Sequence, residues 1–180
     1  MCEQGRLAFW TKLLHLDGFQ VVHEALTAPA EPLRFTVIPQ TPVGLCPHCG
    51  QVCDSIHRRW ESDPVRDLPI GQRVVELTVR VYQFWCDDCA RAFTPPTPWL
   101  TPGGHATQRF LEHARQLIGF GDIANVAAFL HVPENTLARW YYDYVEWRRQ
   151  QPADPSPQPI RQLGIDELSL KKSTVSSWPS

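Results

Sequence analysis

Four cysteines with two identical spacings are the residues of this sequence that most directly predict chemistry. Cys46 and Cys49 lie in the segment CPHCG, and Cys86 and Cys89 lie in the segment CDDC. Two thiolates separated by two residues can lie on one side of a tight turn, so two such turns present four sulfur atoms to one tetrahedral ion. The spacing predicts a zinc ribbon with a structural Zn²⁺. Four protein ligands leave no open position for a catalytic water.

Other ions and other ligands are alternatives for this site. Iron in a rubredoxin-like site is the main chemical alternative, because four thiolates suit both ions. Cys53 and His57 are alternative ligands, although we expect a bystander thiol and a surface histidine at these positions. Cys2 is expected to be an exposed terminal thiol. The first thirty residues contain neither a signal peptide nor a membrane helix, which predicts a cytoplasmic protein with reduced thiols.

A strand predicted from Val74 to Phe84 carries the chain directly into the second cysteine pair at Cys86. Apolar and polar residues alternate along it, as in a half-buried strand. One face carries Val75, Leu77, Val79 and Val81, and the other carries Glu76, Thr78, Arg80 and Tyr82. This strand is therefore expected to set the distance between the two pairs.

The segments before the first cysteine pair predict a helix and a hairpin. Residues 8–16 place Phe9, Leu13 and Leu16 at roughly helical spacing, and Asp17 and Gly18 then favour a turn. Two stretches rich in Val and Phe, Phe19 to Ala25 and Leu33 to Ile38, read as the strands of a hairpin.

Three helices are predicted after a stretch rich in proline and glycine at residues 94–104. They cover Thr107 to Phe120, Asp122 to Leu130 and Glu134 to about Arg149. The third is expected to turn Leu137, Trp140, Tyr141 and Tyr144 inward. A second proline-rich linker follows at residues 151–159.

The second and third of these helices have the spacing of a helix-turn-helix, with a turn at His131 to Pro133. In such a unit the second helix enters the major groove of DNA. Asn135, Thr136 and Arg139 are the base-reading candidates, because Asn and Arg can bond bidentately to adenine and guanine edges. Arg148 and Arg149 suit phosphate contacts.

A plain three-helix bundle is the alternative interpretation of this segment. Three acidic residues offset the three arginines of the third helix, and His131 stands where a glycine is often found. The net charge of the 180-residue chain is −2, so composition gives no general reason to expect nucleic-acid binding. DNA binding must therefore rest on local features.

The order of these pieces resembles the ISL-three family of bacterial insertion-sequence transposases. The resemblance covers about residues 8–172 and rests on CPHCG, Arg58 and Arg59, RDLPIG at Arg66 to Gly71, the strand and second cysteine pair, the three helices and LGIDELSLKK. It implies that a zinc finger and a helix-turn-helix precede an RNase H-like nuclease domain with a DDE triad. It also implies that Arg58 and Arg59 contribute to DNA binding and that Asp166 is the first catalytic acid.

The residues after Asp166 do not supply the rest of such a triad. DDE chemistry uses three carboxylates to hold two divalent ions, and no acidic residue follows Glu167. Mg²⁺ is therefore expected only in a complete DDE domain. We expect a truncated transposase, ended by a frameshift or a premature stop soon after Lys172, without strand-transfer activity of its own.

The sequence thus predicts an α+β fold whose β-rich zinc ribbon precedes a helix-turn-helix domain and an incomplete first strand of an RNase H-like domain. The expected segments are an N-terminal helix and hairpin (1–45), the finger (46–94), a linker (95–106), the helix-turn-helix (107–150), a proline-rich linker (151–159) and the start of the nuclease domain (160–180).

Three functions are compatible with this organisation. The first is recognition of terminal inverted repeats in double-stranded DNA, with a homo-oligomer or the full-length transposase as protein partners, in the bacterial cytoplasm at the nucleoid. The second is an enzyme that is active only when ribosomal slippage fuses a second reading frame to the chain. The third is a zinc-ribbon module for protein association, or a regulator of a full-length transposase.

Overall fold

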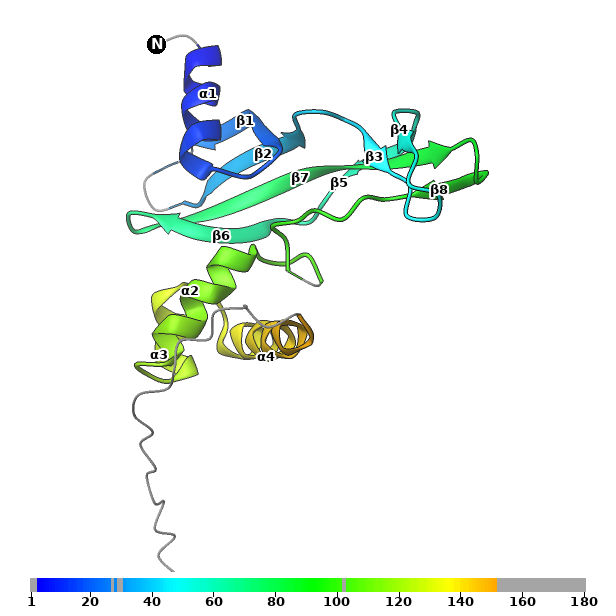
Figure 1. Ribbon diagram of the computed structural model, residues 1–180. Helices are drawn as coiled ribbons and strands as arrows, with labels where there is room; N and C mark the ends of the chain where they lie inside the picture. Colours follow the sequence, from blue (N-terminus) through cyan, green and yellow to red (C-terminus); the bar gives the residue numbers. More distant parts are fainter. Residues whose placement is uncertain (1–2, 27, 29–30, 102, 152–180) are drawn as a thin grey trace, which may run out of the picture. The chain divides into compact units, whose positions relative to one another are not determined.

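The computed structural model describes residues 3–26, 28, 31–101 and 103–151, which fold as a mixed α+β structure (Figure 1). One compact unit covers Met1–Gln150. Its elements are α1 (Glu3–Leu14), β1 (Phe19–Leu26), β2 (Leu33–Pro39), β3 (Gly44–Leu45), β4 (Val52–Cys53), β5 (Ile56–Glu61), β6 (Val65–Ile70), β7 (Arg73–Cys86), β8 (Arg91–Phe93), α2 (Gln108–Ile118), α3 (Ile123–Phe129) and α4 (Glu134–Gln150). The expected strand of an RNase H-like domain lies outside the described residues.

The strand β7 is the centre of the larger sheet and runs along its whole length (Figure 1). On one edge β7 pairs antiparallel with two strands: its first half pairs with β6 and its second half with β5. On the other edge it pairs parallel with β2 and, near its end, antiparallel with β8. The predicted strand from Val74 is confirmed, and it ends at Cys86 as expected.

The two halves of β7 are buried on opposite faces. Val75, Leu77 and Val79 lie in a core with residues of α1, β1, β2 and β6. Phe84 and Cys86 lie in a second core that contains the cysteines. Because side chains alternate along a strand, the change from odd to even positions moves the buried side from one face to the other. The strand therefore supports the main core and the cysteine cluster in turn.

The helix α1 begins and ends earlier than expected, at Glu3 and Leu14 in place of residues 8 and 16. A short helix was expected here and is confirmed, and the side chains of Phe9 and Leu13 are 52% and 49% exposed. Leu14 is buried instead, and the Trp10 ring packs on Phe35 with ring centroids 4.9 Å apart. The helix packs through a stripe that contains Trp10 and Leu14, and Leu16 is buried just beyond its end. The hairpin of β1 and β2 is confirmed.

The three helices after the sheet share one core, to which Phe110, Leu111, Val126 and Leu137 contribute. Side chains cap two of them: Thr107 accepts a hydrogen bond from Phe110 N–H at the start of α2, and Asp122 accepts one from Asn125 N–H at the start of α3. Of the four residues expected to face inward from α4, Leu137 and Tyr144 are buried, Trp140 packs against the core, and Tyr141 is only half-buried.

A membrane span requires a longer apolar stretch than any described helix offers.

Candidate functional site

The four predicted metal ligands come from two hairpin turns. Cys46 and Cys49 lie in the turn between β3 and β4, Cys86 ends β7, and Cys89 lies in the turn before β8. The long stretch between the two pairs is occupied by β4, β5, β6 and β7. Because β7 returns along β5 and β6, it brings the second pair back beside the first.

The sulfur atoms are spaced for a tetrahedral ion. All four Sγ atoms lie within 4.8 Å of one another. The Cys46 and Cys89 sulfurs are 3.8 Å apart, and those of Cys49 and Cys86 are 3.6 Å apart. Four sulfurs about 2.3 Å from a central zinc ion would be separated by about 3.8 Å, whereas a disulfide requires about 2.05 Å. The four cysteines are therefore positioned to bind one metal ion.

The protein environment shifts the pKa values of Cys46 and Cys89 in opposite directions. Hydrogen bonds from the backbone N–H groups of Cys49 and His48 lower the pKa of Cys46 to about 7. A hydrogen bond with the Cys49 thiol, together with burial, raises the pKa of Cys89 to about 12. Adjacent negative charges disfavour one another. A bound divalent cation would favour the deprotonated form of all four cysteines, because its own charge is the largest in such a site.

Both cysteine turns place a left-handed residue directly after the second cysteine, and each is closed by a backbone hydrogen bond from that residue, although the two bonds differ in span. Gly50 follows Cys49 with a φ of 73°, and Ala90 follows Cys89 with a φ of 49°. The Gly50 N–H donates to the Cys46 carbonyl at 2.9 Å, and the Ala90 N–H donates to the Asp87 carbonyl at 3.3 Å. Both turns need a left-handed residue at the position after the second cysteine.

The alternative ligands are not part of this set of four, although Cys53 packs in the same core as Cys46 and Cys86. Within the described part of the chain, the groups that could share a metal ion are the four cysteines alone. Cys53 is buried, which raises the pKa of its thiol to about 11, and its sulfur contacts the Gln51 carbonyl at 3.7 Å. The His57 ring packs on Trp85, with centroids 5.7 Å apart. Cys2 lies outside the described residues.

The candidate base-reading residues lie on the first turns of α4. Asn135 and Arg139 are exposed and share a face of the helix, and Thr136 beside them is half-buried. Arg148 and Arg149 are exposed at the far end of α4, where Arg149 forms an ion pair with Glu146 at 3.7 Å. Their role in DNA binding stays a prediction.

Arg58 and Arg59 form a second group of exposed cations on β5, opposite Gln83 and Tyr82 of β7. The Arg58 guanidinium lies over the Trp60 ring, 5.6 Å from its centroid. The contribution of Arg58 and Arg59 to DNA binding stays a prediction. Asp166, the expected catalytic acid, lies outside the described residues.

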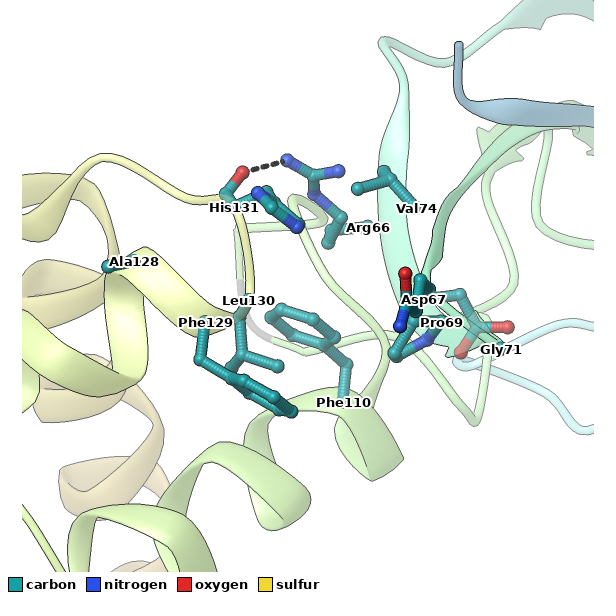
Figure 2. Close-up of a pocket in the computed structure, with 11 residues that line it drawn as sticks. Arg66, Asp67, Pro69, Gly71, Val74, Phe110, Ala128, Phe129, Leu130 and His131 are labelled. Carbon is teal, nitrogen blue, oxygen red and sulfur yellow. Dashed lines mark hydrogen bonds between the residues drawn. The ribbon is translucent and has the colours of Figure 1, made fainter. Parts of the chain in front are cut away.

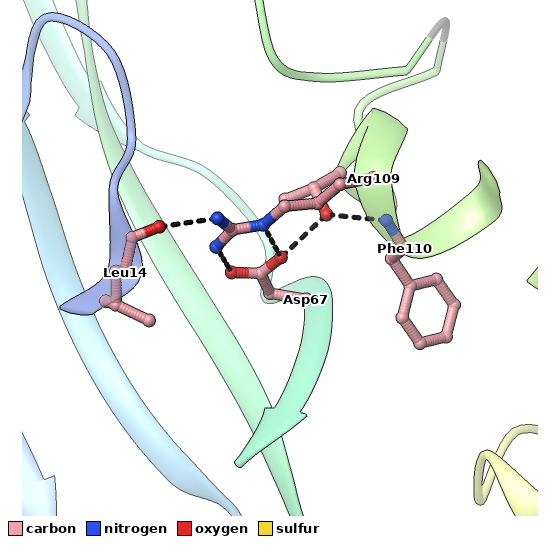
Figure 3. Close-up of polar contacts among 5 residues, drawn as sticks. Leu14, Asp67, Arg109 and Phe110 are labelled. Atoms are coloured by element: carbon pink, nitrogen blue, oxygen red, sulfur yellow. Dashed lines mark hydrogen bonds and ion pairs between the residues drawn. The ribbon is translucent and has the colours of Figure 1, made fainter. Parts of the chain in front are cut away.

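Three residues that the sequence did not single out as functional connect the sheet to the helices. Asp67 of β6 accepts hydrogen bonds from the Thr107 hydroxyl at 2.7 Å and from Arg109 Nε at 2.8 Å, and it also forms an ion pair with the Arg109 guanidinium (Figure 3). Arg66 donates to the His131 carbonyl at 2.7 Å (Figure 2). Arg66 and Asp67 both lie in the RDLPIG segment. The resemblance of this segment to the transposase family was the only feature of the sequence that drew attention to these two residues.

Comparison with known proteins agrees with this geometry. Residues 42–89 match the family described as the zinc-finger of transposase IS204/IS1001/IS1096/IS1165. The chain is also 28% identical over 144 residues to the transposase for insertion sequence element IS1001 from Bordetella parapertussis. That match covers 80% of this chain but 34% of the relative, so the chain spans about a third of the relative's length. No solved structure matches the chain.

The matched segment contains all four clustered cysteines and most of the strands that position them. Residues 42–89 are therefore similar to the zinc finger of the IS204/IS1001/IS1096/IS1165 transposases, and 80% of the chain is similar to the transposase for IS1001.

Proposed function

We propose that the described residues are the DNA-binding part of an insertion-sequence transposase and recognise the terminal inverted repeats of its element. The observation that carries this proposal is the cluster of four cysteines within the segment that matches a transposase zinc finger. Asp166, the acid assigned to catalysis, lies outside the described residues. The proposal therefore concerns recognition of DNA.

The ion in the ribbon is proposed to be a structural Zn²⁺. The four cysteine sulfurs would take all four coordination positions, and a closed tetrahedral set of this kind is typical of structural zinc. The ion would join two short hairpins that have little apolar area of their own: the first contains only the two-residue strands β3 and β4. Its binding free energy would therefore contribute directly to folding of the ribbon.

We propose that α3, the following turn and α4 act as a helix-turn-helix. Val132 in the turn is buried, and Leu137 of α4 packs into the same core as Val126 of α3. This packing leaves Asn135 and Arg139 exposed on the first turns of α4. In a helix-turn-helix these positions face the base edges in the major groove.

The exposed cations of the ribbon are proposed to contact phosphates beside this site. Arg58 and Arg59 project from β5, and Trp60 next to them is also exposed. Phosphate contacts fix the position of a protein on DNA without reading its sequence. The ribbon and α4 would then have different tasks, with base reading assigned to the helix. The boundaries drawn at residues 45, 94 and 106, and self-association of the chain, stay predictions.

A zinc-ribbon module for protein association, or a regulator of a full-length transposase, is the second candidate function. One observation favours it: Leu45 and Val52, paired in the first hairpin, are 66% and 60% exposed. Adjacent exposed apolar side chains are typical of protein interaction surfaces.

Gel-shift titration with a duplex that carries the terminal repeat tests the two candidates. We expect Arg139→Ala to weaken binding by about 5- to 150-fold, corresponding to about 1–3 kcal/mol for one lost bidentate contact. Arg34→Ala is the matched control, because it removes an exposed cation that is paired with Glu76 on the sheet. The control should bind like the unmodified chain. Absence of binding even at low salt would overturn the proposal and favour the protein-association module.

A further inference from the structure

Two adjacent residues of β6 reach the helices from opposite faces of one strand. Asp67 has no exposed side-chain surface, and both of its oxygens contact Arg109 of α2. The same carboxylate accepts a hydrogen bond from Thr107, the residue that caps α2. Arg109 also donates to the Leu14 carbonyl at the end of α1 (Figure 3). One buried carboxylate therefore joins β6 to the start of α2 and, through Arg109, to α1.

Arg66 makes the second connection. Its backbone N–H donates to the His105 carbonyl and its carbonyl accepts from the Thr107 N–H, both at 2.9 Å. These bonds fix the segment before α2 alongside β6. Because neighbouring side chains of a strand point to opposite faces, the Arg66 guanidinium extends away from Asp67. It reaches the carbonyl of His131 in the turn between α3 and α4 (Figure 2).

The contact of Arg66 with this turn lies beside a cavity of about 320 Å³. Pro69, Gly71 and Val74 line it from the sheet, and Phe129 and Leu130 line it from the helices (Figure 2). Close packing between the turn and the sheet is therefore incomplete here. The charge-assisted hydrogen bond from Arg66 bridges a region where apolar packing is reduced, and such a bond is stronger than one between neutral groups.

Resting on the proposed function, we infer that Arg66 and Asp67 are positioning residues that hold α4 at a fixed place relative to the ribbon. The ribbon cations on β5 and the base-reading face of α4 then bind DNA as one rigid body. The partner is a duplex whose two contacted segments lie at one fixed spacing. Neither Arg66 nor Asp67 needs to touch the DNA for this effect.

The spacing dependence of DNA binding tests the inference in the full chain. Footprinting first defines the segments protected by the ribbon and by α4, and about 5 bp are then inserted between them, half of the 10–10.5 bp helical repeat. We expect this insertion to weaken binding of the unmodified chain by about 100-fold. This factor is the lower end of the gain in affinity, about 100-fold or more, that two linked binding modules obtain when both bind at once. Arg66→Met keeps the apolar stem but removes the bond to His131, and it should bind both duplexes with nearly equal affinity.

Two further variants control this experiment. Asp67→Asn keeps the shape of the side chain and removes its charge, and it should also reduce the spacing dependence. Arg80→Met removes an arginine of β7 whose ion-pair partner is Glu61 of β5, so it should keep the dependence of the unmodified chain. If Arg66→Met and Asp67→Asn both keep that dependence, the inference is overturned while the proposed function stands. If the unmodified chain does not bind the duplex, the proposed function fails first.

Hydrogen exchange of the metal-loaded chain provides a test that needs no DNA. Release of the turn from the sheet should increase amide exchange in the α3–α4 turn and the first turns of α4 in Arg66→Met. Exchange in β3 and β4 should be unchanged, and Arg80→Met should match the unmodified chain throughout. Unchanged exchange in the turn and α4 of Arg66→Met would show that Arg66 does not hold the helices, which overturns the inference whatever the DNA result.

Discussion

The two cysteine turns differ at the residue that follows their second cysteine, and this difference predicts mutations of opposite sign. Gly50 and Ala90 occupy equivalent positions, with φ values of 73° and 49°. A left-handed conformation carries no side-chain penalty for glycine but is unfavourable for alanine, whose Cβ approaches the following carbonyl oxygen. We expect Ala90→Gly to stabilise the metal-loaded protein and Gly50→Ala to destabilise it.

The expected magnitude follows from two opposing effects. The left-handed conformation costs a non-glycine residue about 1–2 kcal/mol, while glycine increases the conformational entropy of the unfolded chain by about 0.4–1 kcal/mol. The net change is about 0.5–1 kcal/mol in either direction, or about 1–4 °C in Tm for a chain of this size. Crowding does not contribute at Gly50, because a Cβ there meets no atom within 4 Å. Ala90 is exposed, so little packing is lost with its methyl group.

Thermal unfolding of the metal-loaded protein measures both changes. Gly18→Ala is the matched control, because Gly18 has a φ of 75°, has open space around its Cα and lies in the turn before β1, away from the cysteines in sequence. It should lower Tm by about as much as Gly50→Ala. A stabilising Gly50→Ala, or a destabilising Ala90→Gly, would refute the claim that the left-handed conformation at these two positions decides the sign of the effect.

Three further predictions concern the ribbon and the helices. Removing the metal with a chelator should unfold β3, β4 and β8, because a structural ion contributes folding free energy directly; an unchanged circular dichroism spectrum and Tm would contradict this. In Gly44→Ala the new methyl group would lie 2.7 Å from Pro95 Cγ and 2.9 Å from Phe84 Cδ2. Chemical denaturation should show a loss of about 1–3 kcal/mol, and an unchanged midpoint would show that these rings move aside. A hydrogen bond from Arg115 lowers the pKa of Glu112 in the folded protein. Ionised Glu112 therefore stabilises the fold at pH values above its unfolded-state pKa of about 4.3. This contribution is lost as the pH falls through the lower pKa of the folded state. The difference in unfolding free energy between Glu112→Gln and the unmodified chain should be present at about pH 7 and shrink below about pH 4; a difference independent of pH would exclude this role.

The features that the sequence predicted correctly are those with a local signature. The paired spacing of the cysteines predicts two turns, and the alternation after Val74 predicts the strand that joins them. Together these predict convergence of the four thiols, which the sulfur distances confirm. The capping residues and apolar stripes of the helices are equally local, so their existence and approximate bounds were predictable.

The connections between elements had no such signature. Asp67 and Arg109 are 42 residues apart, and Arg66 and His131 are 65 residues apart. A charged residue on a strand usually faces solvent, and nothing near Asp67 in the sequence indicates that it is fully buried. For α1 the residues Phe9 and Leu13 were too few to fix the buried face, because Trp10 and Leu14 form an equally regular stripe. Tertiary packing decided between the two.

The parallel pairing of β2 with β7 also constrains the order in which the chain can fold. Arg34 of β2 and its partner Glu76 are 42 residues apart, so the ends of a long loop must meet before any bond of this ladder forms. The hairpin of β6 and β7 closes through a short turn and can form first. Both cysteine pairs lie next to the two strands, with Cys46 shortly after β2 and Cys86 at the end of β7. A metal ion captured by both pairs early in folding would shorten that loop and accelerate closure of the sheet.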